Sequence, residues 1–321
     1  MKKKLFLVCV SLVWTVALMA QQIAVVSTSG TKVFRTLQEA IEGADPGSVI
    51  YLPGGGFALP DDVRITKKLI IYGIGHKIQT ENPDGYTTIN GNIFFDKDSD
   101  GSALMGCYVT GTVRIGEDGN KVDDVLIRCN NLFELCVHNN KCQGTDINQN
   151  YIRSNAYFNE ASARFTNNVA DCVHNLDDGV VSDNIIVGIT DDWRADNKAI
   201  YACDRTIITN NIILLDRIHS GDNCSASGNM CLADWGVGFI NVSGEGFDWK
   251  NVFVDYQGVT PNSDFHFKEE YKQYEGKVGI NHGNFSDDQL APIPYIVRKI
   301  IPEHTDAEGK LNIKIRVKAG E

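Results

Sequence analysis

Basic residues are scarce in this chain, and their scarcity excludes whole classes of partner. The sequence holds 30 Lys and Arg against 41 Asp and Glu. Without the three lysines at positions 2–4, which belong to the N-terminal signal described below, 27 basic residues face 41 acidic ones, a net charge of −14. Nucleic-acid binding needs a basic surface and is therefore not expected. The same charge disfavours unaided binding of a polyanionic sugar, although bound cations could bridge one.

Long apolar runs are also missing, with one exception at the start of the chain. The run from Leu5 to Met19 is too short for a membrane span, follows the three lysines and precedes Ala20. This is the pattern of a secretory signal peptide. We therefore expect residues 1–20 to be cleaved near Ala20 and the protein to be secreted or held at the cell surface, with no membrane span.

An asparagine recurs about every twenty residues in a fixed frame, with an apolar residue three positions before it and another one or two after it. The asparagines are Asn130, Asn150, Asn168, Asn184, Asn211 and Asn229, with Asn251 a weaker member and Asn92 and Cys107 extending the series backwards. The upstream apolar residues are Ile127, Ile147, Phe165, Val181, Ile208 and Ala226, and the downstream ones are Leu132, Ile152, Val169, Ile186, Ile213 and Met230. Such a period with uneven spacing is typical of a solenoid whose coils differ in loop length.

Each coil contains short runs of Ile, Val and Phe separated by turn residues, and no amphipathic helix of ten residues occurs between Asn92 and Asn251. The pattern predicts strands that stack in parallel at about 4.8 Å per coil, with right-handed crossovers. The predicted fold is all-β, a single-stranded right-handed parallel β-helix. Because Asn tolerates left-handed backbone and bonds through its amide, we expect the asparagines to hold the turns as a hydrogen-bonded ladder.

Two further elements flank the coils. Leu37, Ala40, Ile41 and Ala44 share one helical face after a Thr36–Glu39 capping box, which predicts a short helix that caps the open end. Residues 257–292 are irregular, and residues 295–301 and 310–318 predict a C-terminal β-hairpin with one apolar face. The expected organisation is a signal peptide at 1–20, a capped β-helix at 21–256 and a C-terminal segment at 257–321.

A family resemblance follows from these stretches. Residues 46–54 and 69–75 contain a Pro-Gly turn, a strand, Leu-Pro-Gly, and a strand that ends in Gly-Ile-Gly, and residues 100–111 resemble the next coil. With the helix before them, they resemble the N-terminal cap and first coils of the pectin-lyase-like superfamily of right-handed parallel β-helix proteins. The signal and the tail resemble those of uncharacterised secreted proteins of Bacteroidetes. The resemblance implies the fold and leaves function open, because this fold hosts lyases, hydrolases, adhesins and inert scaffolds.

Eight cysteines follow the signal, and none forms a Cys-x-x-Cys pair, so a zinc cluster is not expected. An even number in a secreted chain permits disulfides, but burial as small apolar residues in a narrow interior is the favoured interpretation. Cys136 and Cys172 lie two coils apart, about 9.6 Å by strand spacing, which is beyond disulfide reach. We expect them not to pair with each other.

Two similar tetrapeptides, residues 136–139 and 172–175, read Cys-Val-His-Asn, and residues 156–159 lie between them at the matching place. This place, 20 residues after the first tetrapeptide and 16 before the second, predicts that Cys136, Ala156 and Cys172 stack. Depending on which face they occupy, His138, Phe158 and His174 all point inward or all point to solvent. A structural stack is favoured, and the two histidines are too far apart to share a metal ion.

Acidic residues concentrate further along, in the longest coil and its neighbours. The extra residues of that coil should form a loop, and loops on a rigid scaffold often carry function. The residues predicted to be catalytic are Asp191, Asp192, Arg194, His219 and Asp222, and those predicted to bind substrate are Trp193, Asp177 and Asp178. Paired carboxylates would suit glycoside hydrolysis and Trp193 would stack on a sugar. A solvated acidic loop is the alternative.

Tests against two enzyme patterns leave catalysis open. Polygalacturonase-like hydrolases carry Asn-x-Asp, Asp-Asp, Gly-His-Gly and Arg-x-Lys in order. This chain matches the first three of these motifs only loosely, at residues 175–177, 191–192 and 219–221, and it has no Arg-x-Lys within the coils. Pectate lyases need calcium-binding carboxylates and a basic proton acceptor, and no motif assigns these roles to Arg205 or Arg217. Residues 96–101 match half of a calcium loop, but Cys107 stands where a bidentate Glu is required. Calcium is therefore a possible cofactor and no metal ligand is assigned.

Two function hypotheses remain. The first is a secreted β-helix protein that binds polysaccharide and, if it is an enzyme, cleaves it as a polysaccharide lyase or glycoside hydrolase. The second is a non-catalytic cell-surface or adhesion scaffold. An enzyme should show acid, base and cationic groups that converge, whereas a scaffold should show a smooth charged face.

Overall fold

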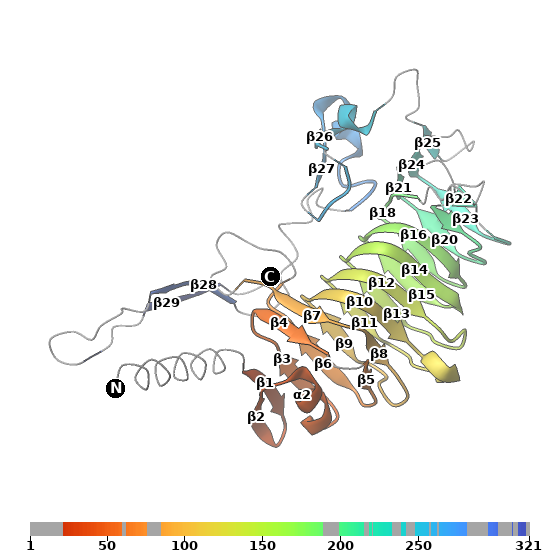
Figure 1. The fold of residues 1–321 in the computed structure, drawn as a ribbon. Coiled ribbons are helices and arrows are strands. Elements are labelled where there is room, and N and C mark those ends of the chain that lie inside the picture. Colours follow the sequence, from red (N-terminus) through yellow and green to blue (C-terminus); the bar gives the residue numbers. More distant parts are fainter. Residues whose placement is uncertain are drawn as a thin grey trace, which may run out of the picture.

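The computed structural model describes residues 22–59, 62–75, 85–188, 199–214, 218–219, 221–232, 239–241, 248–256, 258–261, 263–280, 295–300, 310 and 314–318. Among these residues, no helix has the length and apolar character needed to cross a membrane. The protein is mostly β, with long sheets of parallel strands (Figure 1).

Two long sheets run the length of the stacked strands. The first sheet has the order β2 (Gly30–Phe34), β1 (Ile23–Ser27), β3 (Ser48–Tyr51), β6 (Leu69–Tyr72), β9 (Ala103–Met105), β11 (Leu126–Arg128), β13 (Thr145–Asn148), β15 (Ala163–Thr166), β17 (Val180–Ser182), β20 (Ile207–Thr209) and β23 (Ser225–Ser227). The second sheet has the order β25 (Phe239–Asn241), β24 (Asn229–Cys231), β21 (Ile212–Ile213), β18 (Ile185–Ile186), β16 (Val169–Leu176), β14 (Tyr151–Ala161), β12 (Asn131–Val137), β10 (Tyr108–Ile115), β7 (Thr87–Asn90) and β4 (Gly55–Ala58). Beside this path lie β5 (Val63–Ile65), β8 (Ile93–Phe95), β19 (Ile200–Tyr201) and β22 (Ile218–His219).

The chain alternates between the two sheets, and each passage through both forms one repeat. Every upstream apolar residue of the predicted frame pairs with its counterpart in the next repeat, in the order Ile127, Ile147, Phe165, Val181, Ile208 and Ala226. All but Ala226 are fully buried in one continuous apolar core, and Ala226 packs against it. The predicted repeat and its register in the first sheet are therefore confirmed.

The asparagine ladder is also confirmed. From Asn150 to Asn229, the Oδ1 atom of each ladder Asn accepts hydrogen bonds from the backbone N–H and the side-chain amide of the ladder Asn one repeat earlier. For Asn184 and the preceding Asn168 these donor–acceptor distances are 2.8 and 3.3 Å. The Asn184 amide also donates to the carbonyl of Phe165, the frame residue of the preceding repeat, at 2.9 Å. Each Asn thus satisfies backbone groups of the repeat before it that are shielded from water.

The left-handed backbone lies one position before the ladder, not on it. The residues that precede the six ladder asparagines have φ between 55° and 67°, and they are Cys129, Gln149, Asn167, Asp183, Asn210 and Gly228. The ladder asparagines themselves are not among the residues with left-handed backbone, so their tolerance of it is not used. A ladder side chain has to point into the stack, so the chain reverses at the residue before it.

At the two ends of the asparagine series, one predicted member belongs to the ladder and two do not. Cys107 does occupy the ladder position, since its N–H donates to Asn130 Oδ1 at 3.0 Å. Asn92 lies instead at the bend between β7 and β8, where its Oδ1 accepts from the Thr112 N–H at 2.8 Å. Asn251 belongs to the 3₁₀ helix η2 (Trp249–Asn251) and is exposed.

The second sheet is buried on both faces over part of its length, so the apolar residue that follows a ladder Asn does not always point into the core. Val169 and Met230 lie on its outer face, where they pack against the C-terminal segment. Their neighbours Ala170 and Cys231 belong to the interior core. Strands that are apolar on both faces lose the alternation that separates inside from outside.

The N-terminal end of the stack is covered as predicted. Helix α2 (Leu37–Gly43) begins at the Thr36 capping box and buries Leu37, Ala40 and Ile41. Strand β1 pairs antiparallel with both β2 and β3, so the parallel stack of the first sheet ends in an antiparallel hairpin (Figure 1).

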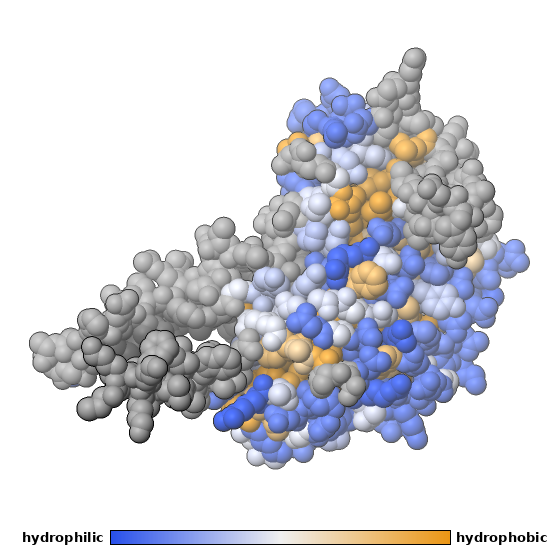
Figure 2. Space-filling view, in the orientation of Figure 1, coloured by the Kyte–Doolittle hydropathy of each residue, from blue (hydrophilic) through white to orange (hydrophobic). Residues whose placement is uncertain are grey.

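A C-terminal segment, residues 248–280, packs on the outer face of the second sheet. It contains η2, the antiparallel pair β26 (Phe253–Asp255) and β27 (Asp264–Phe267), and the 3₁₀ helix η3 (Glu269–Tyr274). Trp249, Phe253 and Phe267 join Ile185 and other outer residues of the sheet in a second apolar cluster. The view in Figure 2 shows mainly hydrophilic side chains, with apolar ones gathered beside this segment and near the first strands.

The predicted C-terminal hairpin is present as the antiparallel pair β28 (Tyr295–Ile300) and β29 (Lys314–Lys318). In Figure 1 it lies to one side of the stacked strands. What its apolar face contacts lies outside the described side chains.

No disulfide joins any of the eight cysteines between Cys107 and Cys231, all of which lie in the described part of the chain. Seven are buried and Cys224 is half-buried, with its thiol donating to the Cys203 carbonyl. Burial raises the pKa of the Cys107 and Cys203 thiols to about 12. The interpretation of the cysteines as small buried residues is confirmed, as is the absence of a Cys136–Cys172 bond.

Replacing Asn184 with Ala should destabilise the protein by roughly 1–3 kcal/mol, because the Phe165 carbonyl and the Asn168 N–H would lose their buried partner. Urea unfolding monitored by circular dichroism measures the loss. The exposed Asn140→Ala variant is the control and should match the wild type. Equal stability of the two variants would contradict the ladder.

In the folded protein at pH 8, Ellman's reagent should react rapidly with no more than one thiol, that of half-buried Cys224. In denaturant and without reductant it should titrate all eight cysteines that follow the signal. A lower total in denaturant would reveal disulfides and would show that the described packing of these side chains is wrong.

Candidate functional site

The structure describes part of the site predicted from sequence. Asp191, Asp192, Trp193 and Arg194 lie outside the described residues. The backbone of His219 pairs with Tyr201 in the second sheet. Asp177, Asp178 and Asp222 are all described, and their contacts show what these carboxylates do.

Asp177, Asp178 and Asp222 lie in neighbouring turns that follow the second sheet. Arg205 contacts both Asp177 and Asp178, with its Nε 3.0 Å from Asp178 Oδ1. The Arg205 N–H donates to the Asp222 carbonyl at 2.9 Å. Arg205, for which no motif gave a role, is the cation that pairs with Asp177 and Asp178, and its backbone N–H joins this turn to that of Asp222. Whether the three carboxylates bind or cleave a substrate stays a prediction.

Other aspartates along the same turns act as acceptors for the next repeat. Asp100 Oδ1 accepts from the Asp123 N–H at 2.6 Å, and Asp123 Oδ1 accepts from the Gln143 N–H at 2.9 Å. Asp204 does the same for the Asp222 N–H at 2.7 Å. Because backbone groups in turns need partners, much of the acidic character of this edge has a structural use.

The outer face of the second sheet carries a row of rings, which we call the ring row, made of His138, Tyr157, His174 and Tyr201. Cys136 pairs with Tyr157, Tyr157 with His174, and His174 with Tyr201. The predicted stacking of Cys136, Ala156 and Cys172 is therefore wrong by one residue at each step. The register shifts lie between Leu132 and Leu135 on one strand and between Ile152 and Asn155 on the next. Phe158 consequently points into the core, fully buried, while the histidines lie on the outer face.

Neighbouring rings of the row contact one another. His174 and Tyr201 stack with centroids 4.7 Å apart and an interplanar angle of 18°. Tyr157 lies 4.8 Å from His174, and it meets His138 edge-on at 6.5 Å. All four side chains are half-buried, and the Tyr157 hydroxyl donates to Asn159 Oδ1 at 2.9 Å. The Nε2 atoms of His138 and His174 are buried, whereas the Tyr157 and Tyr201 hydroxyls can accept hydrogen bonds from a ligand.

A second group lies beside the ring row, where the strands of the second sheet bend. We call Phe133, Arg153 and Asp171 the bend residues, because they fall on consecutive strands within the register shifts. Phe133 is 45% exposed, which is unusual for so large an apolar side chain. The Arg153 guanidinium lies 5.7 Å from its ring centroid and 4.8 Å from that of Tyr108.

Hydrogen bonds hold Arg153 in place. Its guanidinium donates to the Tyr108 hydroxyl at 3.1 Å and to the Val109 carbonyl at 3.0 Å. The cation is therefore fixed between two aromatic rings, and Phe133 is supported from behind with one face open to ligands. Sequence periodicity did not reveal these residues, since the extra residues at each bend disrupt the alternation.

Asp171 is the acidic member of the bend residues. Its side chain is half-buried, and burial raises its pKa to about 6. Burial also raises the pKa of Tyr151 to about 12, and the negative charge of Asp171 adds to that shift. A carboxyl group that is protonated in mildly acidic solution can donate a hydrogen bond to a ligand, which an ordinary aspartate cannot.

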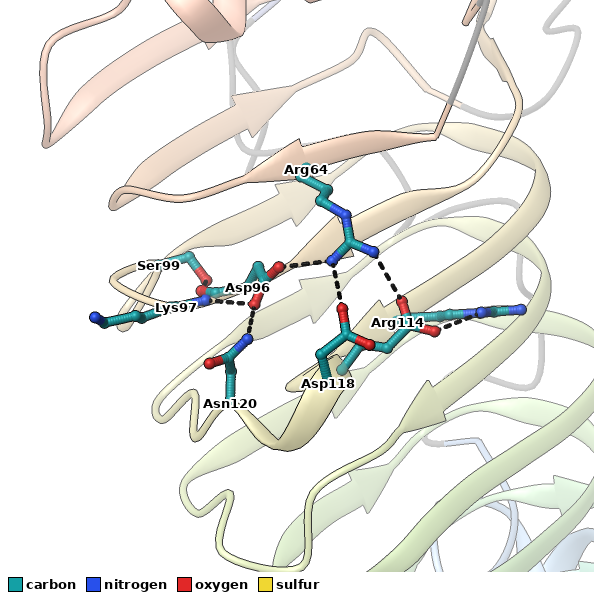
Figure 3. A network of polar contacts seen from close by, with 8 residues as sticks. Arg64, Asp96, Lys97, Ser99, Arg114, Asp118 and Asn120 are labelled. Carbon is teal, nitrogen blue, oxygen red and sulfur yellow. Dashed lines mark hydrogen bonds and ion pairs between the residues drawn. The ribbon is translucent and has the colours of Figure 1, made fainter.

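Towards the N-terminus the outer row continues as Arg64, Phe94 and Arg114. Figure 3 shows Arg64 and Arg114 with their polar partners. Both guanidiniums lie against the Phe94 ring, 4.9 and 5.3 Å from its centroid. Arg64 also binds Asp96 at 2.7 Å and Asp118 at 3.3 Å. These charges neutralise one another, so this network stabilises the stack and leaves little for a ligand.

Asp96, the first residue of the half-matching calcium loop, is part of that network. Burial opposes its ionisation, but hydrogen bonds from the Lys97 N–H and from Arg64 bring its pKa below the ordinary value. Among the described residues, no group of three or more His, Cys, Asp or Glu side chains is placed to hold a metal ion.

Comparisons with known proteins add no match. No protein-family model matches the chain, and neither the curated proteins nor the solved structures provide a match. The outer face of the second sheet, with the bend residues and the ring row, is thus identified as a candidate site by its own geometry.

Replacing Asp171 with Asn should change how stability depends on pH. A raised carboxyl pKa means that the folded state binds its proton more tightly, so Asp171 favours folding below about pH 4 and that benefit is lost as pH rises through about 6. Relative to the wild type, the variant should therefore gain roughly 1–3 kcal/mol between pH 4 and pH 8.

Chemical unfolding at several pH values measures this difference. The exposed Asp222→Asn variant is the control, and its stability should follow the pH dependence of the wild type. A pH profile of Asp171→Asn parallel to that of the wild type would show that Asp171 is solvated rather than buried.

Proposed function

We propose that the protein is a right-handed parallel β-helix of the pectin-lyase-like kind. Parallel sheets that alternate along the chain, a buried amide ladder and a helix that covers the first repeat all support this proposal. The handedness follows the general preference of parallel crossovers. Secretion, based on the signal at residues 1–20, is part of the same proposal.

We propose further that the protein binds polysaccharide along the outer face of the second sheet. The observation that carries this proposal is the exposed ring of Phe133, held over the fixed cation Arg153. An aromatic face supported in this way binds the apolar face of a sugar ring without first having to be ordered. Few large apolar side chains are exposed to this degree in the described structure, and Phe133 is the aromatic one nearest to the ring row.

The ring row extends this surface in the direction of a linear ligand. Successive strands place equivalent side chains about 4.8 Å apart, which is close to the length of one sugar residue. The Tyr157 and Tyr201 hydroxyls can exchange hydrogen bonds with sugar hydroxyls. Consecutive repeats would thereby contact consecutive units of the polysaccharide.

Cleavage of the bound chain, by a polysaccharide lyase or a glycoside hydrolase, is a separate hypothesis. Asp171 is protonated below about pH 6 and lies beside the proposed binding surface, as a general acid must. The remaining groups would come from the predicted loop at residues 191–198, which lies outside the described residues. The same hypothesis includes a calcium ion that would bridge this acidic protein to an acidic sugar.

The alternative function is a non-catalytic surface or adhesion scaffold. One observation favours it: the rings of the row stack on one another, and the charges of Arg64 and Asp96 are mutually satisfied. Groups that are already paired with one another can stabilise the fold without binding a ligand. Binding experiments separate the two functions.

In a screen against plant and host polysaccharides by affinity electrophoresis, Phe133→Ala and Tyr201→Ala should each weaken retention of the protein by about five- to tenfold, the loss expected for one aromatic contact of about 1 kcal/mol. Released reducing ends or unsaturated products, scored in the same samples, would show cleavage.

Tyr51→Ala provides the matched control. Tyr51 is 38% exposed on the first sheet, where it stacks on Tyr72 at 5.7 Å, and it should be dispensable for retention. Equal retention of all variants and wild type by a polysaccharide, or retention by none of the panel, would favour the scaffold.

A further inference from the structure

The C-terminal segment returns to the stacked repeats at one fixed point. The Gly279 N–H donates to the Asn210 carbonyl at 2.7 Å. Gly279 has φ of +71°, and a Cβ atom added there would lie 2.5 Å from the Ile212 side chain. Only glycine fits both constraints, and the neighbouring Val278 and Ile280 are buried. The segment is therefore held at a set distance from the corner of the repeats.

A cleft of about 260 Å³ opens beside this contact. One wall comes from the corners of two repeats and from β25, and the other comes from η3 and the turn after it. The lining residues are Asn210, Gly228, Ile240, Gln273, Tyr274, Lys277 and Val278. None of them belongs to the bend residues or to the ring row.

Gly228, which lines the cleft, stands at a corner that carries a side chain in the earlier repeats. The five preceding corners hold Cys129, Gln149, Asn167, Asp183 and Asn210, all with the same left-handed backbone. A Cβ atom at Gly228 would lie 2.6 Å from Asn210 Oδ1. The missing side chain leaves the Asn210 carboxamide uncovered at the mouth of the cleft.

The polar groups of the lining favour an anion. Lys277 has no carboxylate within ion-pair distance among the described residues, whereas Lys272 of the same segment pairs with Glu275 at 3.3 Å. An exposed lysine without a partner in a chain of 41 acidic residues is a local positive charge. Gln273 and Asn210 add carboxamides, which can donate to or accept from hydroxyl groups.

The apolar lining and the volume of the cleft further restrict the kind of ligand that it can bind. Ile240 and Val278 supply an apolar floor, and the half-buried Tyr274 supplies a ring. Pockets for drug-sized ligands usually hold roughly 300–1,000 Å³, so this smaller cleft suits a single ring. We propose that it binds a small hydroxylated carboxylate about the size of one sugar ring, with the carboxylate on Lys277 and the hydroxyls on Gln273 and Asn210.

Ligand-observed saturation-transfer NMR with the full-length protein tests this proposal, with D-glucuronate as the probe and D-glucose as its neutral counterpart. Glucuronate should show transfer and glucose should show far less. Lys277→Ala should weaken glucuronate binding by about tenfold or more, the loss of one charge-assisted hydrogen bond, and Gln273→Ala should weaken it by a smaller factor.

Two controls make the outcome decisive. Lys272→Ala removes an ion-paired lysine of the same segment, and Phe133→Ala alters the separate polysaccharide surface, and both should bind glucuronate as the wild type does. Absence of transfer in the wild type, or equal loss in Lys272→Ala and Lys277→Ala, would overturn the proposal. Thermal melting of each variant establishes that it is folded.

Discussion

Buried hydrogen bonding by one asparagine per repeat is the constraint on which the rest of this structure depends. Each ladder Asn binds the backbone of the preceding repeat from the inside, where no water can replace it. A repeat that slipped by one residue would lose these bonds and would also turn its apolar residues outward. The ladder therefore fixes the register of both sheets as well as the turn in which it lies.

A fixed register determines what the outer surface can present. Side chains at equivalent positions of successive strands form straight rows, and in this way Tyr157, His174 and Tyr201 become neighbours at 4.7–4.8 Å. His138 lies two residues beyond the equivalent position and meets Tyr157 edge-on at 6.5 Å. The bends of the second sheet interrupt that regularity and admit Phe133, Arg153 and Asp171. The regular part of the fold thus positions the ring row, and the irregular part supplies the exposed aromatic face, the fixed cation and the buried acid.

The sequence predicted the inside of the protein better than its surface. The apolar frame around each Asn identified the residues of the first sheet that point inward. Burial requires an apolar side chain at Ile127 and its counterparts, and no other role obscures that pattern. The frame failed at Val169 and Met230, where the C-terminal segment buries the outer face and removes the alternation. The predicted stacking of Cys136 on Ala156 was wrong, because a bulge adds a residue that periodicity does not reveal and Cys136 pairs with Tyr157.

The candidate site shows the same division. Asp177, Asp178 and Asp222 lie in neighbouring turns because turns recur at the same place in each repeat, but their contacts with Arg205 and with backbone groups depend on the path of each loop. Phe133, Arg153 and Asp171 could not be found from sequence, since their roles arise only when bends from three repeats meet. The cleft at Lys277 likewise requires the return of the C-terminal segment to Asn210, a contact between distant parts of the chain.

Native-state hydrogen exchange measured by mass spectrometry tests the central claim most directly. If the ladder fixes the stack, peptides that span Asn130 to Asn211 should exchange only through global unfolding and should be the slowest in the protein. Peptides from residues 248–280, which pack on one face of the second sheet, should exchange faster. Exchange of the ladder peptides as fast as that of the exposed turns would contradict the claim that the buried asparagines hold the repeats in register.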